Sequence, residues 1–484
     1  SGDLPVLRRL LGASAAGEVE TGSRQFPDAA FYAAYTGLGP SRLGRYFFIQ
    51  PRDDQAGLRL VGEAIPHGEP FWVTASRHGR RCIAVDTPKC HFAPPRDGIH
   101  VTGWGAHGFH TALRVAPAAL ERDFIARYGH YPLPNCDDHG RSRRSYRRLR
   151  DGLLAGVAAR RRLLLDLATA SEWDLFLAVF SETHCAGHNL WHLHDPTHPQ
   201  YRAAVEIGDG LRDVYVAVDA AIGALIAAVG AETRVVLFSS QGMRPQYHGR
   251  ELIPSLLRLW GMGEPQDRAP QPEGESRQSA HVPLLKRLRD AVPLPLQYAV
   301  KRRLPLALSD ALLCRLVGAA ALDVEARAYQ VPNNEMTPAL RINLAGRDPR
   351  GRVRPGREYE ALRDFLGARL GELINPATGR AALDDVTLTD ERYPGPYRSV
   401  LPDVTGYWSP AAPIEALYSP GYGTVVGAHR DYRTGGHGPE GFLSISGATG
   451  RLAAAHIADV APTVLELLGV PVPPDLDGRS ALSR

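Results

Sequence analysis

The stretch that decides the fold is residues 173–240, which read as strand, helix, strand. Residues 173–181 (WDLFLAVFS) and 233–240 (TRVVLFSS) are short, almost continuously apolar runs. Between them, residues 210–230 (GLRDVYVAVDAAIGALIAAVG) repeat apolar side chains every three to four positions. Continuously apolar strands are typical of a parallel sheet with both faces covered by helices. We therefore predict an α/β fold with a central, mostly parallel sheet sandwiched by helices, to which residues 80–86 (RRCIAVD) add a strand.

The composition is that of an ordinary globular protein. The 484 residues are 44% hydrophobic and 22% charged, with a formal net charge of +4. The arginines are scattered among acids, which argues against a nucleic-acid partner, and we interpret the one dense patch, residues 141–150 (RSRRSYRRLR), as a solvated helix face. No run of about 18 apolar residues and no signal-peptide core occurs, so we predict a cytoplasmic protein without a membrane partner. The five cysteines form no CxxC pair, which indicates neither a disulfide framework nor a zinc ribbon.

The predicted core is interrupted by an insert. We assign residues 1–263 and 401–484 to the α/β core and residues 264–400 to an accessory region. A flexible loop is expected near residues 264–280, where Pro, Gln and Glu are frequent and periodicity is absent. The chain opens on a helix-like segment, residues 1–13 (SGDLPVLRRLLGA), with no strand before it.

Histidines are concentrated directly after the strand at 173–181. Residues 184–198 hold five of the 18 histidines of the chain. Because ligands of open α/β sheets bind outside the carboxyl ends of the strands, this cluster lies where a site is expected. His184 and His188, four residues apart, can present both imidazoles to one metal ion. The alternative is a His-rich loop that bonds to the backbone, and this alternative suits His194 and His198.

A further histidine, His437, lies in a Gly-rich segment (RTGGHGPEGFLSISG, residues 433–447). Gly435 and Gly436 allow a close approach of the backbone, which leaves His437 free to point into a crevice.

Several segments resemble the alkaline phosphatase superfamily, in particular its type I phosphodiesterase/nucleotide pyrophosphatase branch. They are TGLGPSRLGRYFF (36–48), THCAGH (183–188), LFSSQGM (237–243), LRINLAGRDPRG (340–351), LPDVTGYW (401–408) and the ending with GGHGPEGFL (435–443) and IADVAPTVLELLGVPVPPDLDGRS (457–480). They follow the family order over nearly the whole chain. The resemblance implies an alkaline phosphatase-like fold with an accessory subdomain and a site for two metal ions.

Carried over by position, the first of these metal sites consists of His184, His188 and His437. His184 stands where the family has Asp. Three imidazoles still make a sound zinc triad with one open position. The resemblance therefore implies one divalent metal ion per chain, and zinc fits the ligands.

The second site and the nucleophile depart from the family pattern. Ser240 and Gln241 replace Asp and His, and neither is a good ligand for a divalent ion. We expect both to bind no metal and to face substrate in the cleft. The nucleophile should lie seven to nine residues before Thr36, but residues 27–29 (PDA) offer no hydroxyl, and Leu43 replaces the usual His before Gly44. Catalysis through an alkoxide nucleophile is therefore not supported. In the family an early Asp ends a first strand, and the resemblance implies that this first strand of the core is missing here.

Two acids are candidates for catalysis. Glu182 can act as a general base or orient a histidine. Asp28 can act as a carboxylate nucleophile or ligand, or simply belong to a surface turn. Other residues could line a substrate pocket or serve turns and packing: Thr36, Trp191, Asn333, Asn334 and Arg347.

Two classes of function stay open. The first is a metal-dependent hydrolase or group-transferase that acts on a small-molecule phospho- or sulfo-ester or anhydride. The second is a catalytically silent member that binds a ligand or partner through the former cleft. The replaced second-site residues favour the silent member, whereas retention of the histidines favours the enzyme. The sequence leaves the oligomeric state open.

Overall fold

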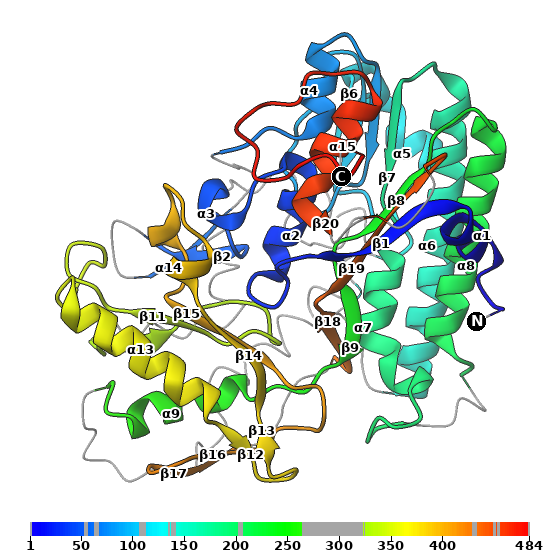
Figure 1. Cartoon of the computed structure of the whole chain (residues 1–484). Helices are drawn as coiled ribbons and strands as arrows, with labels where there is room; N and C mark the ends of the chain where they lie inside the picture. Colours follow the sequence, from blue (N-terminus) through cyan, green and yellow to red (C-terminus); the bar gives the residue numbers. More distant parts are fainter. Residues whose placement is uncertain are drawn as a thin grey trace. The chain divides into compact units, whose positions relative to one another are not determined.

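Helices and strands are interspersed along the chain in this computed structural model, which confirms the mixed α/β class (Figure 1). The structure describes residues 2–52, 57–61, 67–105, 113–133, 136, 142–201, 207–263, 323, 325–427, 433–448, 452 and 455–482. Contacts divide the chain into a first unit, Ser1–Gly44, Glu63–Tyr247 and Arg430–Arg484, and a second unit, Arg45–Gly62 and His248–His429. The loop predicted near residues 264–280 lies outside the described residues. None of the described helices combines the length and apolar composition needed to cross a membrane.

The strand predicted at 173–181 is β7 (Leu175–Ala178), the edge of a mostly parallel sheet in the first unit. Its order is β6-β5-β4-β7, with β4 (Cys82–Val85) parallel to both β5 (Gly98–Thr102) and β7, and β6 (Arg114–Ala116) antiparallel to β5. Ile83 and Val85 of β4 pack in a cluster with α5 (Ala118–Tyr128) and α6 (Arg143–Ala170), whereas Cys82 and Ala84 pack in another. Burial of both strand faces explains the continuous apolar run.

The strand predicted at 233–240 is β8 (Val236–Ser239), which belongs to a second four-stranded sheet of the first unit. Its order is β20-β1-β19-β8. Strand β19 (Glu440–Ser446) runs antiparallel to both β8 and β1 (Ser14–Glu20), and β20 (Ala455–His456) runs parallel to β1. Ala15 and Val19 of β1, Leu443 and Ile445 of β19, and Cys82 and Ala84 of β4 all belong to one core cluster.

Strand β1 corrects the expectation that the first strand is missing. Its sequence, SAAGEVE, contains no apolar run that would indicate a strand. Only Ala15 and Val19 are buried. Gly17 is required by a close approach: a Cβ there would lie 2.9 Å from the carbonyl oxygen of Leu452. Small side chains that permit tight packing thus conceal the strand.

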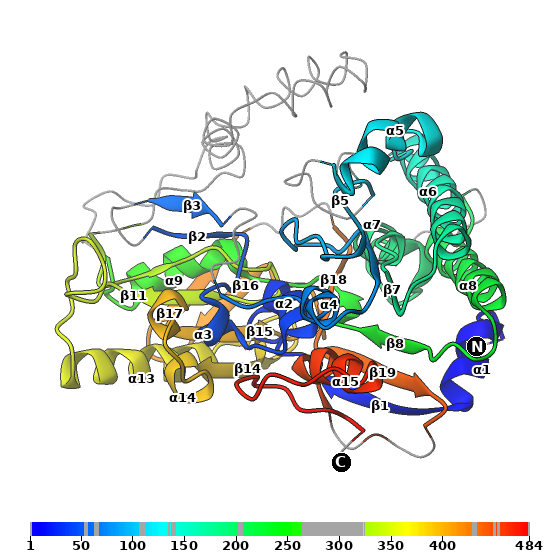
Figure 2. The ribbon, with the colours of Figure 1, turned by 90° about the horizontal axis from the view of Figure 1, so that it is seen from above.

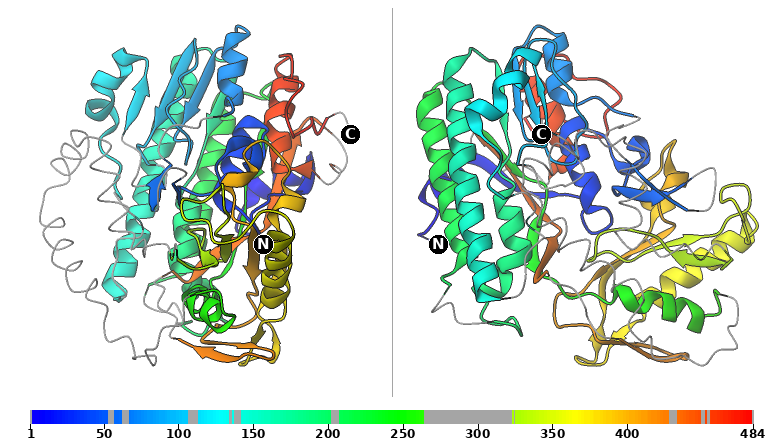
Figure 3. Two further views of the ribbon diagram at one scale, coloured as in Figure 1. Left: turned by 90° about the vertical axis from the view of Figure 1, so that its left-hand side faces the viewer. Right: turned by 180° about the vertical axis from the view of Figure 1, so that it is seen from behind.

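Three helices of the first unit pack side by side: α6, α7 (Glu182–His194) and α8 (Gly210–Val229) (Figures 1 and 3). Helix α1 (Pro5–Gly12) lies against α8 (Figure 2). The buried Asp219 carboxylate on α8 accepts hydrogen bonds from the backbone N–H groups of Val6 and Leu7, at 3.1 and 2.8 Å. These bonds satisfy two of the free donors at the start of α1.

The other described α-helices and strands of the first unit are α2 (Pro27–Thr36), α3 (Pro40–Leu43), α4 (Phe71–Arg77), β9 (Gly242–Pro245), β18 (Gly435–Gly438) and α15 (Val460–Leu467).

The second unit has its own core. Its main sheet is antiparallel, in the order β10 (Ala328–Gln330), β11 (Ala339–Ile342), β15 (Val404–Trp408) and β14 (Leu383–Leu388). Helix α13 (Arg357–Gly371) packs on it and buries Leu362, Leu366 and Leu370 (Figure 1). The other α-helices and strands that the structure describes in this unit are β2 (Ile49–Pro51), β3 (Leu58–Leu60), α9 (Ile253–Leu259), α14 (Thr389–Arg392) and a sheet of β13 (Arg380–Ala381), β12 (Ile374–Asn375), β16 (Ala416–Ser419) and β17 (Gly423–Val426).

A buried histidine in β5 makes stability depend on pH. Burial, with a smaller contribution from His91, lowers the pKa of His100 to about 3 from its ordinary 6.5. Between these values the unfolded chain binds a proton that the folded chain does not. The contribution of neutral His100 to the free energy of unfolding is therefore fully present above pH 6.5. It is lost as the pH drops towards 3, by up to about 1.4 kcal/mol per pH unit.

We expect His100→Gln to make this slope shallower in urea unfolding measured from pH 7 to 4. The matched control is His78→Gln, since His78 is exposed. Equal slopes for wild type and His100→Gln would contradict the assignment.

Candidate metal centre

Three imidazoles from distant parts of the first unit converge. His184 and His188 lie four residues apart on α7, and His437 lies on β18. The Nε2 atom of His437 lies 2.9 Å from Nε2 of His184 and 3.1 Å from Nε2 of His188, and the latter two atoms are 3.2 Å apart. The structure thus brings together the three histidines predicted to meet, although some 250 residues separate His437 from the other two.

This geometry fits a tetrahedral metal ion. With zinc–nitrogen bonds of about 2.0–2.1 Å, two ligand nitrogens on one ion lie about 3.3 Å apart. Without a cation, three imidazole nitrogens at these distances turn lone pairs towards one another. These lone pairs repel, because one proton can bridge only one pair of nitrogens. His188 Nδ1 donates to the carbonyl oxygen of Gly435 at 2.7 Å. Since a carbonyl can only accept, the proton stays on Nδ1 and leaves His188 Nε2 free to coordinate.

The backbone around β18 sets this convergence. The backbone N–H of Thr434 donates to the carbonyl of His188 at 2.8 Å, which ties the start of β18 to α7. On its other side β18 pairs with β9, where His437 lies opposite Met243. Gly435 permits the contact with α7, because a Cβ there would lie 2.1 Å from the carbonyl oxygen of Gly187.

We expect Gly435→Ala to push β18 away from α7. The added methyl meets rigid backbone, so the variant should lose about 1–3 kcal/mol of stability and bind zinc more weakly than wild type. Thermal unfolding and zinc titration measure the two effects. Gly12→Ala is the control, since a Cβ at Gly12 meets nothing within 4 Å. A Gly435→Ala protein with unchanged zinc affinity would show that this contact does not set the site.

The two residues that replace second-site ligands lie beside the triad. Gln241 Nε2 lies 3.2 Å from Nε2 of His437. The Gln241 Oε1 atom is buried and has no hydrogen-bond partner among the described residues. Ser240 is buried next to it, and its carbonyl oxygen accepts a hydrogen bond from Ser23 Oγ at 3.3 Å.

Two hydroxyl residues near the site were not predicted from the sequence. Thr21 and Ser23 follow the end of β1, where Thr21 Oγ1 donates to the carbonyl of Pro439 at 2.9 Å and Ser23 bonds to Ser240. These bonds place both residues beside the segments that carry His437 and Gln241. Recognition of β1 would have located them, because polar residues that follow a core strand lie at the edge of a sheet.

Glu182, a candidate base, begins α7 and is fully buried in an ion network. It accepts hydrogen bonds from Arg160 Nε at 2.8 and 3.1 Å and from the Tyr131 hydroxyl at 2.7 Å. Arg160 Nη1 also donates to Asp86 at 2.8 Å. Burial opposes the charge of Arg160, but Glu182 and Asp86 outweigh it and raise the pKa of Arg160 above its ordinary value. These partners anchor the Glu182 carboxylate at the start of α7, two residues before His184, whereas a general base must reach a proton of the substrate.

Asp28, the other acid, is buried in the first turn of α2. Both its oxygens accept hydrogen bonds from Lys89 Nζ at 2.9 Å. It is therefore neither a surface turn acid nor a free nucleophile. Thr36 ends the same helix, where its hydroxyl donates to the carbonyl of Tyr32 and accepts from the N–H of Leu38, so its contacts are structural.

Other predicted pocket residues make turn and packing contacts. Trp191 Nε1 donates to Asp195 at the end of α7. In the second unit, Asn333 Oδ1 accepts from the N–H of Asn334, and Asn334 Oδ1 accepts from the N–H of Met336, which closes a turn.

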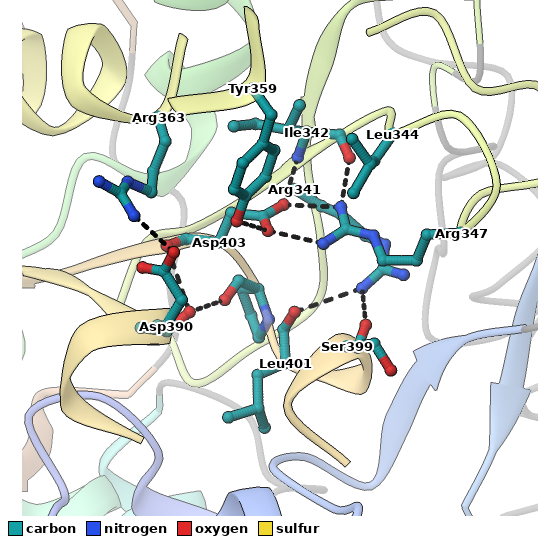
Figure 4. Close-up of polar contacts among 12 residues, drawn as sticks. Arg341, Ile342, Leu344, Arg347, Tyr359, Arg363, Asp390, Ser399, Leu401 and Asp403 are labelled. Atoms are coloured by element: carbon teal, nitrogen blue, oxygen red, sulfur yellow. Dashed lines mark hydrogen bonds and ion pairs between the residues drawn. The ribbon is translucent and has the colours of Figure 1, made fainter. Parts of the chain in front are cut away.

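Arg347 belongs to an ion network in the second unit (Figure 4). It donates to both oxygens of Asp403 at 2.7 and 2.8 Å and to Asp348 at 2.9 Å, and Arg341 donates to Asp348 at 2.6 Å. Burial opposes its charge, but Asp403 and Asp348 raise the pKa of Arg347 above its ordinary value. The Tyr359 hydroxyl also donates to Asp403. These contacts hold Arg347 in a buried ion network of the second unit.

The sequence model of the type I phosphodiesterase / nucleotide pyrophosphatase family matches residues 2–259. No curated protein matches the chain. Among solved structures, the chain is similar to phosphonoacetate hydrolase from Sinorhizobium meliloti 1021 in complex with phosphonoformate (13% identity, TM-score 0.48, covering 95% of this chain and 89% of that chain). It is also similar to murine (12%, 0.45, 98% and 92%) and human (11%, 0.44, 97% and 91%) ectonucleotide pyrophosphatase / phosphodiesterase 5.

Proposed function

The chain belongs to the type I phosphodiesterase/nucleotide pyrophosphatase family, and we propose that it is a metal-dependent hydrolase or group-transferase. Its substrate would be a phospho- or sulfo-ester or anhydride of a small molecule. The observation that carries the proposal is the convergence of three Nε2 atoms, of His184, His188 and His437, within 2.9–3.2 Å.

These histidines would hold one divalent ion, for which zinc suits three imidazole ligands. When bound, the ion supplies a Lewis acid that polarises a phosphoryl or sulfuryl oxygen and activates water. The protein orients the ligands: Gly435 holds the proton of His188 on Nδ1, and the contact of Glu182 with Arg160 anchors the first turn of α7.

Two features of the site support a single ion and a non-standard mechanism. The two residues at the second-site positions, Ser240 and Gln241, are neutral, and a second ion bound by such groups would be poorly compensated. Asp28 is already paired with Lys89. The same features favour the alternative of a silent, ligand-binding member, which the experiment separates.

The test combines metal analysis with a substrate screen. Purified protein is stripped with a chelator, reconstituted with zinc, and assayed on nitrophenyl phosphate, bis-nitrophenyl phosphate and nitrophenyl sulfate. We expect about one zinc per chain and zinc-dependent hydrolysis of at least one ester. Two ions would show that the second site persists. Zinc binding without turnover of any ester would favour the silent member, and no zinc would refute the proposed site.

A further inference from the structure

We infer that Gln241 is a fourth ligand of the ion, through its amide oxygen, so that the centre is closed in the absence of substrate. This inference rests on the proposed function, because it requires that His184, His188 and His437 hold an ion. It replaces the expectation from the sequence that Gln241 binds no metal.

The first observation is an unsatisfied oxygen. Gln241 is 9% exposed, and its Oε1 atom has no hydrogen-bond partner among the described residues. A buried polar atom without a partner costs about 1–3 kcal/mol, and such atoms in native proteins call for an explanation. Coordination of a cation by this oxygen would provide one.

The second observation is the position of the amide. Gln241 Nε2 lies 3.2 Å from His437 Nε2, the atom that faces His184 and His188. Once His437 Nε2 gives its lone pair to an ion, it can no longer accept a hydrogen bond from the amide. Rotation of the amide by half a turn exchanges nitrogen and oxygen. The oxygen then faces the ion, and the amide nitrogen moves to the position that the oxygen has left.

The third observation is that the backbone holds Gln241 in place. Ser239 Oγ donates to the Gln241 carbonyl at 2.8 Å, directly after β8. The next residues form β9, in which Gly242 pairs with Gly438 and Met243 pairs with His437. Gln241 therefore directly precedes β9, the strand that pairs with the strand of His437, and little chain entropy is lost when both residues contact one ion.

The ligand chemistry gives this arrangement a role. Three imidazoles leave one position of a tetrahedral zinc site open. An amide oxygen is a neutral ligand, so it fills that position but yields to an anionic oxygen of a substrate. The residue that replaces a second-site histidine would thus serve the first site, and Gln241 would hold the fourth position until substrate arrives.

The test uses cobalt(II) and zinc with two variants of the full chain. Gln241→Leu removes the oxygen at similar volume, and Gln241→Glu keeps an oxygen at the same reach but removes the amide nitrogen. We expect Gln241→Leu to bind both metals about 10-fold more weakly than wild type, and Gln241→Glu to bind them at least as tightly. In the cobalt form, thiocyanate should change the visible spectrum of Gln241→Leu at lower concentration than that of wild type, because the fourth position is no longer held by protein.

The outcomes are distinguishable. Wild-type affinity and thiocyanate response in Gln241→Leu would overturn the inference and leave the proposed function intact. Equal weakening in both variants would also overturn it, because the amide nitrogen would then be the group that matters. Absence of metal binding by the wild type would overturn both. Circular dichroism of the metal-free variants checks that each is folded.

Discussion

His437→Ala should abolish zinc binding and turnover together. Loss of one of three imidazoles removes a direct ligand, and even residues that only support a ligand cost 10–100-fold in affinity or activity. We therefore expect zinc affinity and any zinc-dependent hydrolysis to fall by more than about 100-fold. Zinc titration with a chromophoric competitor and the ester assay measure the two quantities.

His194→Ala is the matched control for this change. His194 lies at the end of the same helix, α7, but is exposed and paired with Asp209 at 2.7 Å. Its loss should leave zinc affinity unchanged. If the His437→Ala protein retained zinc as wild type does, the three imidazoles would be a hydrogen-bonded cluster and the silent member would be the better description.

Arg160→Met should be the most destabilising change near the site. Arg160 is fully buried between Glu182 and Asp86, which are also fully buried. Its removal leaves two carboxylates in the interior without a counter-charge, and loss of one partner of a buried pair typically costs about 3–5 kcal/mol. Urea unfolding at neutral pH measures the loss.

The neighbouring Arg161→Met is the control, because Arg161 is exposed on the same helix and should change the free energy of unfolding by less than about 0.5 kcal/mol. Adding Glu182→Gln and Asp86→Asn to Arg160→Met removes the uncompensated charges and should recover part of the loss. A single variant as stable as wild type would show that the network is not needed to hold α7.

Local patterns in the sequence predicted the fold class and the three histidines. The apolar runs that became β7 and β8 indicated buried strands, because a strand covered on both faces has no polar side. The spacing of His184 and His188 fixes their proximity on one helix, and Gly435 beside His437 indicated a close backbone approach. In each case the physical cause acts over a few residues, so the sequence displays it directly.

The pairing of strands and the partners of buried charges could not be predicted in this way. The apolar run of β8 indicates a strand, but not that this strand pairs antiparallel with β19, more than 200 residues later. Strand β1 is concealed by its small residues, and with it the position of Thr21 and Ser23.

What the sequence by itself determined is the alternation of helices and strands and the residue types at the metal centre. Only the tertiary structure decided what each acid and amide does. Asp28 and Glu182 look like reactive carboxylates until Lys89, 61 residues away, and Arg160, 22 residues away, are seen to neutralise them. Gln241 looks like a lost ligand until its side-chain amide is found beside His437. The physical reason is that the charge, burial and availability of a polar group depend on neighbours that folding supplies from elsewhere in the chain.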